Sequence, residues 1–197
     1  MFNPIESYCT DKFQYILIHK NGCSTMVNAI NSNFKYTLNQ FVYNDRPSFT
    51  IIRDPWERTI SGLSYDLCRT FGDVTEEIID EIDLHRIFYQ PINARQRVTG
   101  FISHVSVQTG YLFDINPTFY IDLKNLSHFL NIHFGESNTK VLNQSDNQIK
   151  TKLVNILEKR SDIKDAIDKY LSIDYYFIER IKNTEIFWDF SMGKMWK

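Results

Sequence analysis

Residues 19–26, with the sequence HKNGCSTM, guide our interpretation of the whole chain. They follow a short apolar run at Phe13–Ile18 and precede a segment, Met26 to Phe34, whose apolar residues recur at helical spacing. The order strand, tight loop, helix places the N–H groups of a helix N-terminus where they can bind an anion. The loop has residue types found in phosphate-binding loops, although the standard pattern GxxxxGK[ST] is absent.

A lysine, a glycine and two hydroxyl side chains suit this loop to a tetrahedral anion. Lys20 supplies a positive charge on a flexible side chain. Gly22 lets the backbone approach a ligand closely, and Ser24 and Thr25 offer hydroxyl donors. An ordinary strand-to-helix turn with a surface lysine is the alternative interpretation of the same residues.

Composition narrows the classes of protein to which the chain can belong. Its 197 residues fit a single domain over residues 1–197 with a core of ordinary size. Hydrophobic residues make up 43% and aromatic residues 15%, which argues against disorder. The net charge of −2 argues against a general nucleic-acid binder, so an anion site must be local.

Cysteine usage and the length of the apolar runs indicate a compartment. Cys9, Cys23 and Cys68 are widely spaced and form no CxxC pair, which predicts neither a disulfide framework nor a zinc site. A reduced, cytosolic setting is therefore favoured. Residues Met1–Lys12 lack the pattern of a signal peptide, and no apolar run approaches the roughly 20 residues that a membrane helix needs. We expect a soluble, cytoplasmic protein that does not associate with membranes.

Apolar runs that alternate with helical patterns predict an α/β fold, with a central, mainly parallel sheet flanked by helices. Strands are expected at Phe13–Ile18, Phe49–Ile52, Phe119–Ile121 and Val141–Leu142. Helices are expected at Ser24–Phe34, Pro55–Thr70, Thr75–Tyr89, Leu123–Asn131, Asn147–Lys159 and Ser161–Ile181. The segment Phe101–Leu112 fits either a loop or a helix. Ligands of such sheets bind at the carboxyl ends of strands.

A second stretch, at residues 52–62, has the sequence IRDPWERTISG. Arg53 ends a predicted strand, Asp54 can cap the helix that follows, and Pro55 suits the first helical position. Ser61 lies two turns into that helix. Arg53 and Ser61 can face one anion beside the first loop, because a planar guanidinium donates two parallel hydrogen bonds to phosphate. The alternative is a local ion pair between Arg53 and Asp54, with Ser61 as a small packing residue.

Together the two stretches are more specific than either alone. The pattern K-x-G-x-[ST]-T followed by R-D-P-[FW]-E-R-x-x-S resembles the cytosolic-to-Golgi superfamily of sulfotransferases, and most closely the branch that includes many carbohydrate sulfotransferases. Those enzymes have a P-loop-like fold and use 3′-phosphoadenosine 5′-phosphosulfate as donor. Their first motif holds the 5′-phosphosulfate, and their second holds the 3′-phosphate through its arginine and serine. The resemblance thus implies two groups of donor contacts: Lys20, Gly22, Cys23, Ser24 and Thr25 for the phosphosulfate, and Arg53 and Ser61 for the 3′-phosphate.

Four later segments extend the resemblance. Residues 93–100, NARQRVTG, are similar to an N-x-x-Q-x-R/V-L-x-G segment of that branch, and residues 104–108, HVSVQ, to its H-W-x-P-Q segment without the tryptophan and proline. Residues 142–145 resemble its N-K-S loop, and residues 170–177 its Y-x-x-D-[FY]-x-x-F segment with one extra residue. The departures fall mainly on the acceptor side, so the resemblance is informative about the donor and leaves the acceptor open.

The implied reaction is in-line transfer of a sulfuryl group, in which catalysis comes from positioning and charge stabilisation. Lys20 would offset charge on the sulfuryl and bridging oxygens, and no metal is required. An attacking hydroxyl needs a general base, and His104 is our candidate because it falls in the segment that resembles H-W-x-P-Q. Arg97 could contact the 3′-phosphate or an anionic acceptor; as an alternative, it is a solvated charge after a helix.

Expected partners are therefore the small nucleotide donor and a glycan or other small hydroxyl acceptor. Two competing functions remain open. A phosphoryl-transfer, kinase-like enzyme would share the loop–helix arrangement, but it predicts a Walker lysine and a magnesium-binding acidic residue after a strand. Asp54 follows a strand, although its capping position already explains it. A non-catalytic relative would keep the nucleotide or glycan site and lack turnover.

Overall fold

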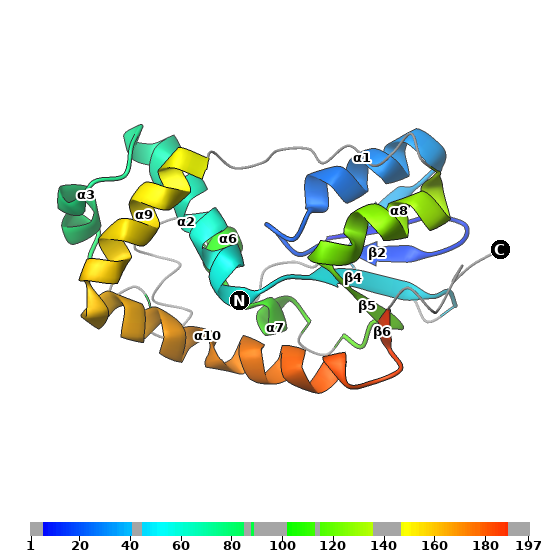
Figure 1. Ribbon diagram of the computed structural model, residues 1–197. Helices are drawn as coiled ribbons and strands as arrows, with labels where there is room; N and C mark the ends of the chain where they lie inside the picture. Colours follow the sequence, from blue (N-terminus) through cyan, green and yellow to red (C-terminus); the bar gives the residue numbers. More distant parts are fainter. Residues whose placement is uncertain are drawn as a thin grey trace. The chain divides into compact units, whose positions relative to one another are not determined.

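The computed structural model describes residues 6–40, 45–84, 88, 102–112, 115–135 and 147–188 (Figure 1). The chain forms two compact units whose segments interleave along the sequence. The helical unit, as we call it, takes Asp54–Val107 and Gln144–Tyr176. The sheet unit takes Phe2–Arg53, Gln108–Asn143 and Phe177–Lys197. That residues 1–197 make one domain stays a prediction.

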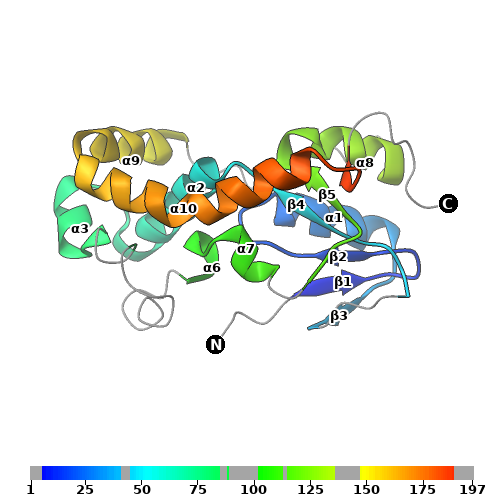
Figure 2. The same cartoon turned by 90° about the horizontal axis from the view of Figure 1, so that it is seen from below.

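Six strands form a mixed sheet in the order β3-β1-β2-β4-β5-β6 (Figure 2). Their bounds are β1 Ser7–Cys9, β2 Gln14–Ile16, β3 Thr37–Asn39, β4 Ser48–Ile52, β5 Phe119–Asp122 and β6 Phe187–Trp188. Strands β2, β4, β5 and β6 pair in parallel, with Ile16 opposite Thr50 and Ile51 opposite Ile121. Strand β1 is antiparallel to both β2 and β3. The predicted mainly parallel sheet is therefore wrong, because β1 and β3 add an antiparallel part that carries no long apolar run.

Helices cover both faces of this sheet within the sheet unit. Helices α1 (Cys23–Asn33) and α8 (Leu126–Phe134), which follows the 3₁₀ turn η1 (Leu123–Asn125), lie side by side on one face (Figure 1). Side chains alternate along the strands, so one face contributes a core with α1 and α8 that includes Tyr15, Leu17, Phe49, Ile51, Phe119 and Ile121. The opposite face packs with α7 (Gln108–Tyr111) and the end of α10 (Ser161–Lys182) through a core that includes Ile16, Ile18, Ile52, Tyr111, Tyr120 and Ile178.

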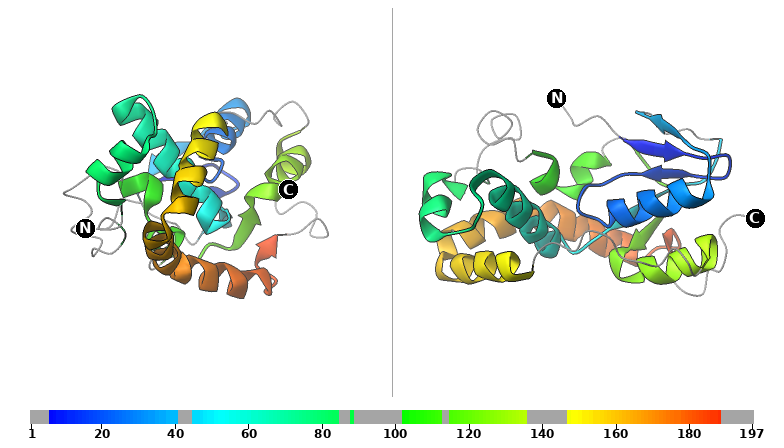
Figure 3. Two further views of the ribbon diagram at one scale, coloured as in Figure 1. Left: turned by 60° about the vertical axis from the view of Figure 1, so that its left-hand side comes forward. Right: turned by 90° about the horizontal axis from the view of Figure 1, so that it is seen from above.

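The helical unit is built from α2 (Pro55–Phe71), α3 (Glu76–Glu81), α6 (Ile102–Val105), α9 (Asn147–Lys159) and the first part of α10, shown from two further directions in Figure 3. As predicted, Asp54 caps α2 by accepting a hydrogen bond from the Glu57 N–H at 2.9 Å, and Pro55 takes the first helical position. The core of this unit is mainly aliphatic and includes Leu63, Leu67, Leu153, Leu157, Ile167 and Leu171. None of the helices in the described ranges is both long enough and apolar enough to cross a bilayer.

Most of the predicted elements are confirmed, with small shifts at their ends. Three predicted strands correspond to β2, β4 and β5, and five predicted helices correspond to α1, α2, α8, α9 and α10. The helix predicted at Thr75–Tyr89 is shorter in its described part: α3 ends at Glu81, and Asp83 then adopts a φ of +46°. The segment Phe101–Leu112 contains the two short helices α6 and α7. The strand predicted at Val141–Leu142 lies outside the described residues.

Candidate functional site

The loop between β2 and α1 has an unusual backbone. Lys20 has a φ of +66° and Gly22, the residue before α1, a φ of +74°. A left-handed non-glycine residue is strained, and such strain clusters at functional sites. Alternation of left- and right-handed residues turns backbone N–H groups toward a common point that can bind an anion. Because α1 begins without a side-chain cap and has no acidic residue in its first turn, the positive end of its dipole keeps its charge.

Gly22 also permits a close approach inside the sheet unit. A Cβ atom at this position would lie 2.7 Å from Leu123 Cδ1 and 2.8 Å from Leu126 Cδ2. Both distances are shorter than ordinary van der Waals contact. The start of α1 therefore packs directly on the leucines of η1 and α8, and this packing sets the position of the loop.

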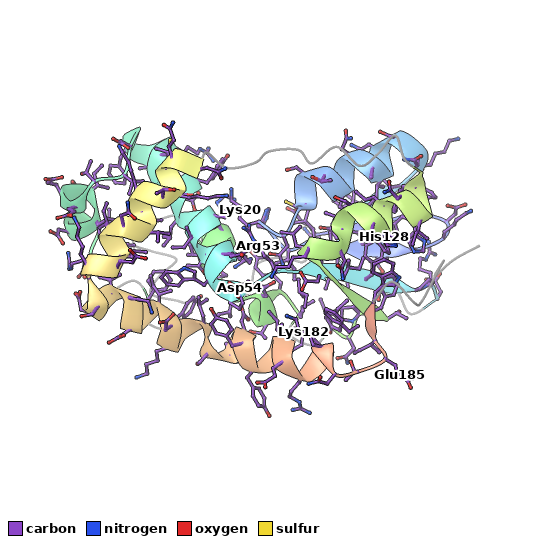
Figure 4. The ribbon with its side chains drawn as sticks, viewed as in Figure 1. Lys20, Arg53, Asp54, His128, Lys182 and Glu185 are labelled. Carbon is purple, nitrogen blue, oxygen red and sulfur yellow. The ribbon has the colours of Figure 1, made fainter. Side chains whose placement is uncertain are left out.

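Arg53 lies immediately after β4, beside this loop. Its guanidinium Nη1 donates a hydrogen bond to the Lys20 carbonyl oxygen at 3.2 Å, and Figure 4 shows the two residues next to each other. Strands β2 and β4 are parallel neighbours, so the segments that follow them meet at one edge of the sheet. The structure thus brings Lys20 and Arg53 together with the N-terminus of α1, within one unit.

Two fully buried amide side chains connect the loop to the end of β4. Asn21 Nδ2 donates to the Ile51 carbonyl at 2.7 Å and to Gln108 Oε1 at 2.6 Å. Gln108 Oε1 also accepts from the Arg53 N–H at 3.0 Å, while Gln108 Nε2 donates to the Arg53 carbonyl at 2.8 Å. Sequence reasoning assigned no role to either amide. The only sequence signal was the place of Gln108 at the end of the HVSVQ segment.

Ser61 and His104, the other two predicted site residues that the structure describes, belong to the helical unit. Ser61 lies on α2 and is 3% exposed. His104 lies on α6, and its Nδ1 is 2.6 Å from Asp66 Oδ1, a residue of α2. The Tyr65 ring packs edge-on against the His104 ring, with centroids 5.2 Å apart.

The pairing of His104 with Asp66 has a chemical consequence. A hydrogen bond between Nδ1 of an imidazole and a carboxylate fixes the orientation of the ring. The backbone of α6 at His104 approaches Gly62 closely, because a Cβ atom at residue 62 would collide with the His104 carbonyl oxygen. The close packing of α2 and α6 therefore requires glycine at residue 62. Asp66 was missed by sequence reasoning, since one acidic residue within a helix carries no signal of its partner.

For the tyrosines near the loop, burial has a larger effect on the pKa than neighbouring charges have. The pKa of Tyr15, on β2, is raised well above its usual value by burial first, and then by the neighbouring Cys23 and Tyr8. Burial likewise raises the pKa of Tyr8. Both phenols are therefore neutral at physiological pH.

The predicted residues divide between the two units. The sheet unit holds Lys20, Gly22, Cys23, Ser24, Thr25 and Arg53 in one place. Arg97 lies outside the described residues. Within the described ranges, no group of three or more histidine, cysteine, aspartate or glutamate side chains could hold a metal ion. Comparisons of the chain with protein-family models, with curated proteins and with solved structures give no match.

Proposed function

We propose that this chain is a sulfotransferase that uses 3′-phosphoadenosine 5′-phosphosulfate and transfers its sulfuryl group to a hydroxyl, expected to lie on a carbohydrate. The observation that carries the proposal is the Lys20 loop with Arg53 beside it at the uncapped start of α1. Two cations and a helix N-terminus favour an anionic group at this edge of the sheet. Because the chain as a whole has a net charge of −2, binding of an anion would depend on local cations such as these.

In the proposed reaction the bond from sulfur to the bridging phosphate oxygen breaks, and a bond from sulfur to the acceptor oxygen forms. The leaving group is 3′,5′-adenosine bisphosphate, and the acceptor proton passes to a general base. Lys20 offsets the negative charge that develops on the leaving phosphate. That His104 is this base stays a prediction, and the hydrogen bond between its Nδ1 and Asp66 Oδ1 supports it, because general bases are commonly oriented by a carboxylate.

We also propose a cytoplasmic location for the enzyme. Its support is the cysteine content, since Cys9, Cys23 and Cys68 are all free thiols. Free cysteines are typical of proteins in a reducing compartment.

Binding of the product nucleotide tests the proposed function directly. We expect 3′,5′-adenosine bisphosphate to raise the thermal unfolding midpoint, and ATP with Mg²⁺ to leave it unchanged. A ligand present at 100 times its Kd stabilises the folded state by about 2.7 kcal/mol, which is readily measured. The absence of any shift at millimolar bisphosphate, or an equal shift with ATP and Mg²⁺, would reject the proposal.

A matched pair of variants locates the site. Lys20→Asn removes the positive charge, and asparagine tolerates the left-handed backbone of residue 20. A loss of binding in this variant would therefore come from the lost charge and not from a changed backbone. Lys35→Asn makes the same change at an exposed lysine of the same unit. We expect only the Lys20 variant to lose the bisphosphate-induced shift. Transfer of radiolabelled sulfate to a panel of glycans and phenols then distinguishes an enzyme from a non-catalytic binder.

A further inference from the structure

We propose that Gln108 is a positioning residue for the anion site: its side-chain amide holds Arg53 and the Lys20 loop in the arrangement that binds the ligand. This inference rests on the proposed function for the identity of its ligand. Gln108 is fully buried at the start of α7, so it acts through its neighbours and does not contact the ligand itself.

The hydrogen bonds of Gln108 fix the main chain of Arg53 from both sides. Its Oε1 accepts from the Arg53 N–H, and its Nε2 donates to the Arg53 carbonyl, at 3.0 and 2.8 Å. A neighbouring strand would make the same pair of bonds, but β4 ends at Ile52. Gln108 therefore gives Arg53, the first residue after β4, the pair of main-chain hydrogen bonds that a neighbouring strand would otherwise supply.

The same amide reaches the loop through Asn21. Gln108 Oε1 accepts from Asn21 Nδ2 at 2.6 Å, and Asn21 Nδ2 also donates to the Ile51 carbonyl at 2.7 Å. Asn21 lies between the two left-handed residues of the loop, Lys20 and Gly22. The network thus connects the loop after β2 with the end of β4, and the bond from the Arg53 guanidinium to the Lys20 carbonyl completes it.

Burial makes this network selective for one arrangement. Asn21 and Gln108 are both 0% exposed, and a buried polar group without a partner is costly. A displacement of the loop away from Gln108 would break the bond between Asn21 and Gln108 and leave a fully buried amide without that partner. Because apparent affinity scales with the fraction of molecules in the binding-competent arrangement, loss of Gln108 should weaken binding without removing any contact to the ligand.

A pair of buried glutamines allows the test. Gln108→Met removes the three hydrogen bonds and keeps nearly the same side-chain volume. Gln14→Met makes the same change at another fully buried glutamine of the sheet unit, which lies on β2 and donates to Ser7 Oγ at 2.7 Å. For each variant we would measure the thermal unfolding midpoint and, by calorimetry, the Kd for 3′,5′-adenosine bisphosphate and for inorganic pyrophosphate.

Both variants should unfold at lower temperature, since each leaves a buried partner unsatisfied. Only Gln108→Met should also raise the Kd for both anions, by about tenfold if the competent fraction falls to one tenth. A Kd in Gln108→Met that matches the Kd in Gln14→Met would overturn the inference. If Gln108→Met does not fold, Asn21→Ala takes its place: it leaves the bonds from Gln108 to Arg53 and should raise the Kd by a smaller factor, and an unchanged Kd would overturn the inference.

The wild-type protein separates this inference from the proposed function. Wild-type binding of pyrophosphate without binding of the bisphosphate would reject the nucleotide donor, and the pyrophosphate Kd of the variants would still decide the role of Gln108. Wild-type binding of the bisphosphate with equal affinity in both glutamine variants would keep the proposed function and reject the role of Gln108. Binding of neither anion by the wild type would overturn both.

Discussion

Replacing Gly22 with alanine tests how the anion-binding loop is held in place. Two separate effects oppose the substitution. Gly22 has a φ of +74°, and an L-residue pays about 1–2 kcal/mol for a left-handed conformation. The new Cβ would also lie 2.7 and 2.8 Å from two leucine methyl groups, where about 3.5–4.0 Å is the favourable separation between carbon atoms. Forcing extra atoms into a packed core costs about 1–3 kcal/mol.

The two effects together predict that Gly22→Ala lowers the free energy of unfolding of the sheet unit by about 2–5 kcal/mol. Gly72→Ala is the matched control. Gly72 has a similar φ, +82°, at the end of α2, but no atom beyond its neighbours lies within 4 Å of the position of its Cβ. This control should therefore cost only the backbone strain, about 1–2 kcal/mol.

Native-state hydrogen exchange suits this comparison because it reports the stability of each unit separately. Amides of β4 report on Gly22→Ala, and amides of α2 report on Gly72→Ala. If Gly22→Ala costs no more than the control, the packing of the loop on Leu123 and Leu126 contributes nothing, and our account of the loop position fails. We also expect Gly22→Ala to weaken binding of 3′,5′-adenosine bisphosphate, since it moves the start of α1.

Three further changes have defined outcomes. Asp54→Ala removes the carboxylate that accepts the Glu57 N–H and should lower the free energy of unfolding by about 1 kcal/mol in urea titrations; an unchanged value would show that α2 does not need this cap. Asp66→Asn takes the carboxylate from His104 and should slow sulfate transfer by about 10²-fold or more at unchanged donor affinity; wild-type rates would exclude His104 as a base held by Asp66. Burial raises the pKa of Tyr120 from 10.0 to about 12. Between these values the unfolded state has lost the phenol proton and the native state keeps it, so stability should fall as pH rises from 10 toward 12. Tyr120→Phe should reduce that slope in urea titrations, and an equally steep slope in the variant would contradict the assignment.

The strands that sequence reasoning predicts correctly, β2, β4 and β5, lie in longer apolar runs, whereas the missed strands β1 and β3 lack such runs and the missed strand β6 is only two residues long. Phe49–Ile52 is buried throughout, and each of its residues is an aromatic or β-branched type that favours strands. Thr37–Asn39 alternates polar and apolar side chains over only three residues, and Leu38 is 64% exposed. Ser7–Cys9 is equally short. Because these two strands form the antiparallel part of the sheet, their weak patterns explain why a mainly parallel sheet was predicted.

Lys20 and Arg53, the cations of the candidate site, can be predicted from local sequence. The residues that form hydrogen bonds with the predicted site residues cannot. Lys20 and Arg53 are recognisable because each follows an apolar strand and precedes a helix signal. Gln108 and Asp66 depend on partners far along the chain: Gln108 bonds to Arg53, 55 residues earlier, and Asp66 to His104, 38 residues later. A single polar residue in a sequence does not reveal such a partner, since the contact exists only after the strands and helices have packed.

The interleaved path of the chain affects how it can fold during synthesis. The sheet unit uses three separate stretches, and β6 at Phe187–Trp188 is the last described part of the sheet to leave the ribosome. Strand β5 is exposed at one edge until then, because β6 is its partner on that side. The described segments of the helical unit, in contrast, are complete once Tyr176 has been made. Domains generally fold as units as their chain emerges, so we expect the helical unit to acquire protease resistance first, and no single cut of the chain to release either unit whole.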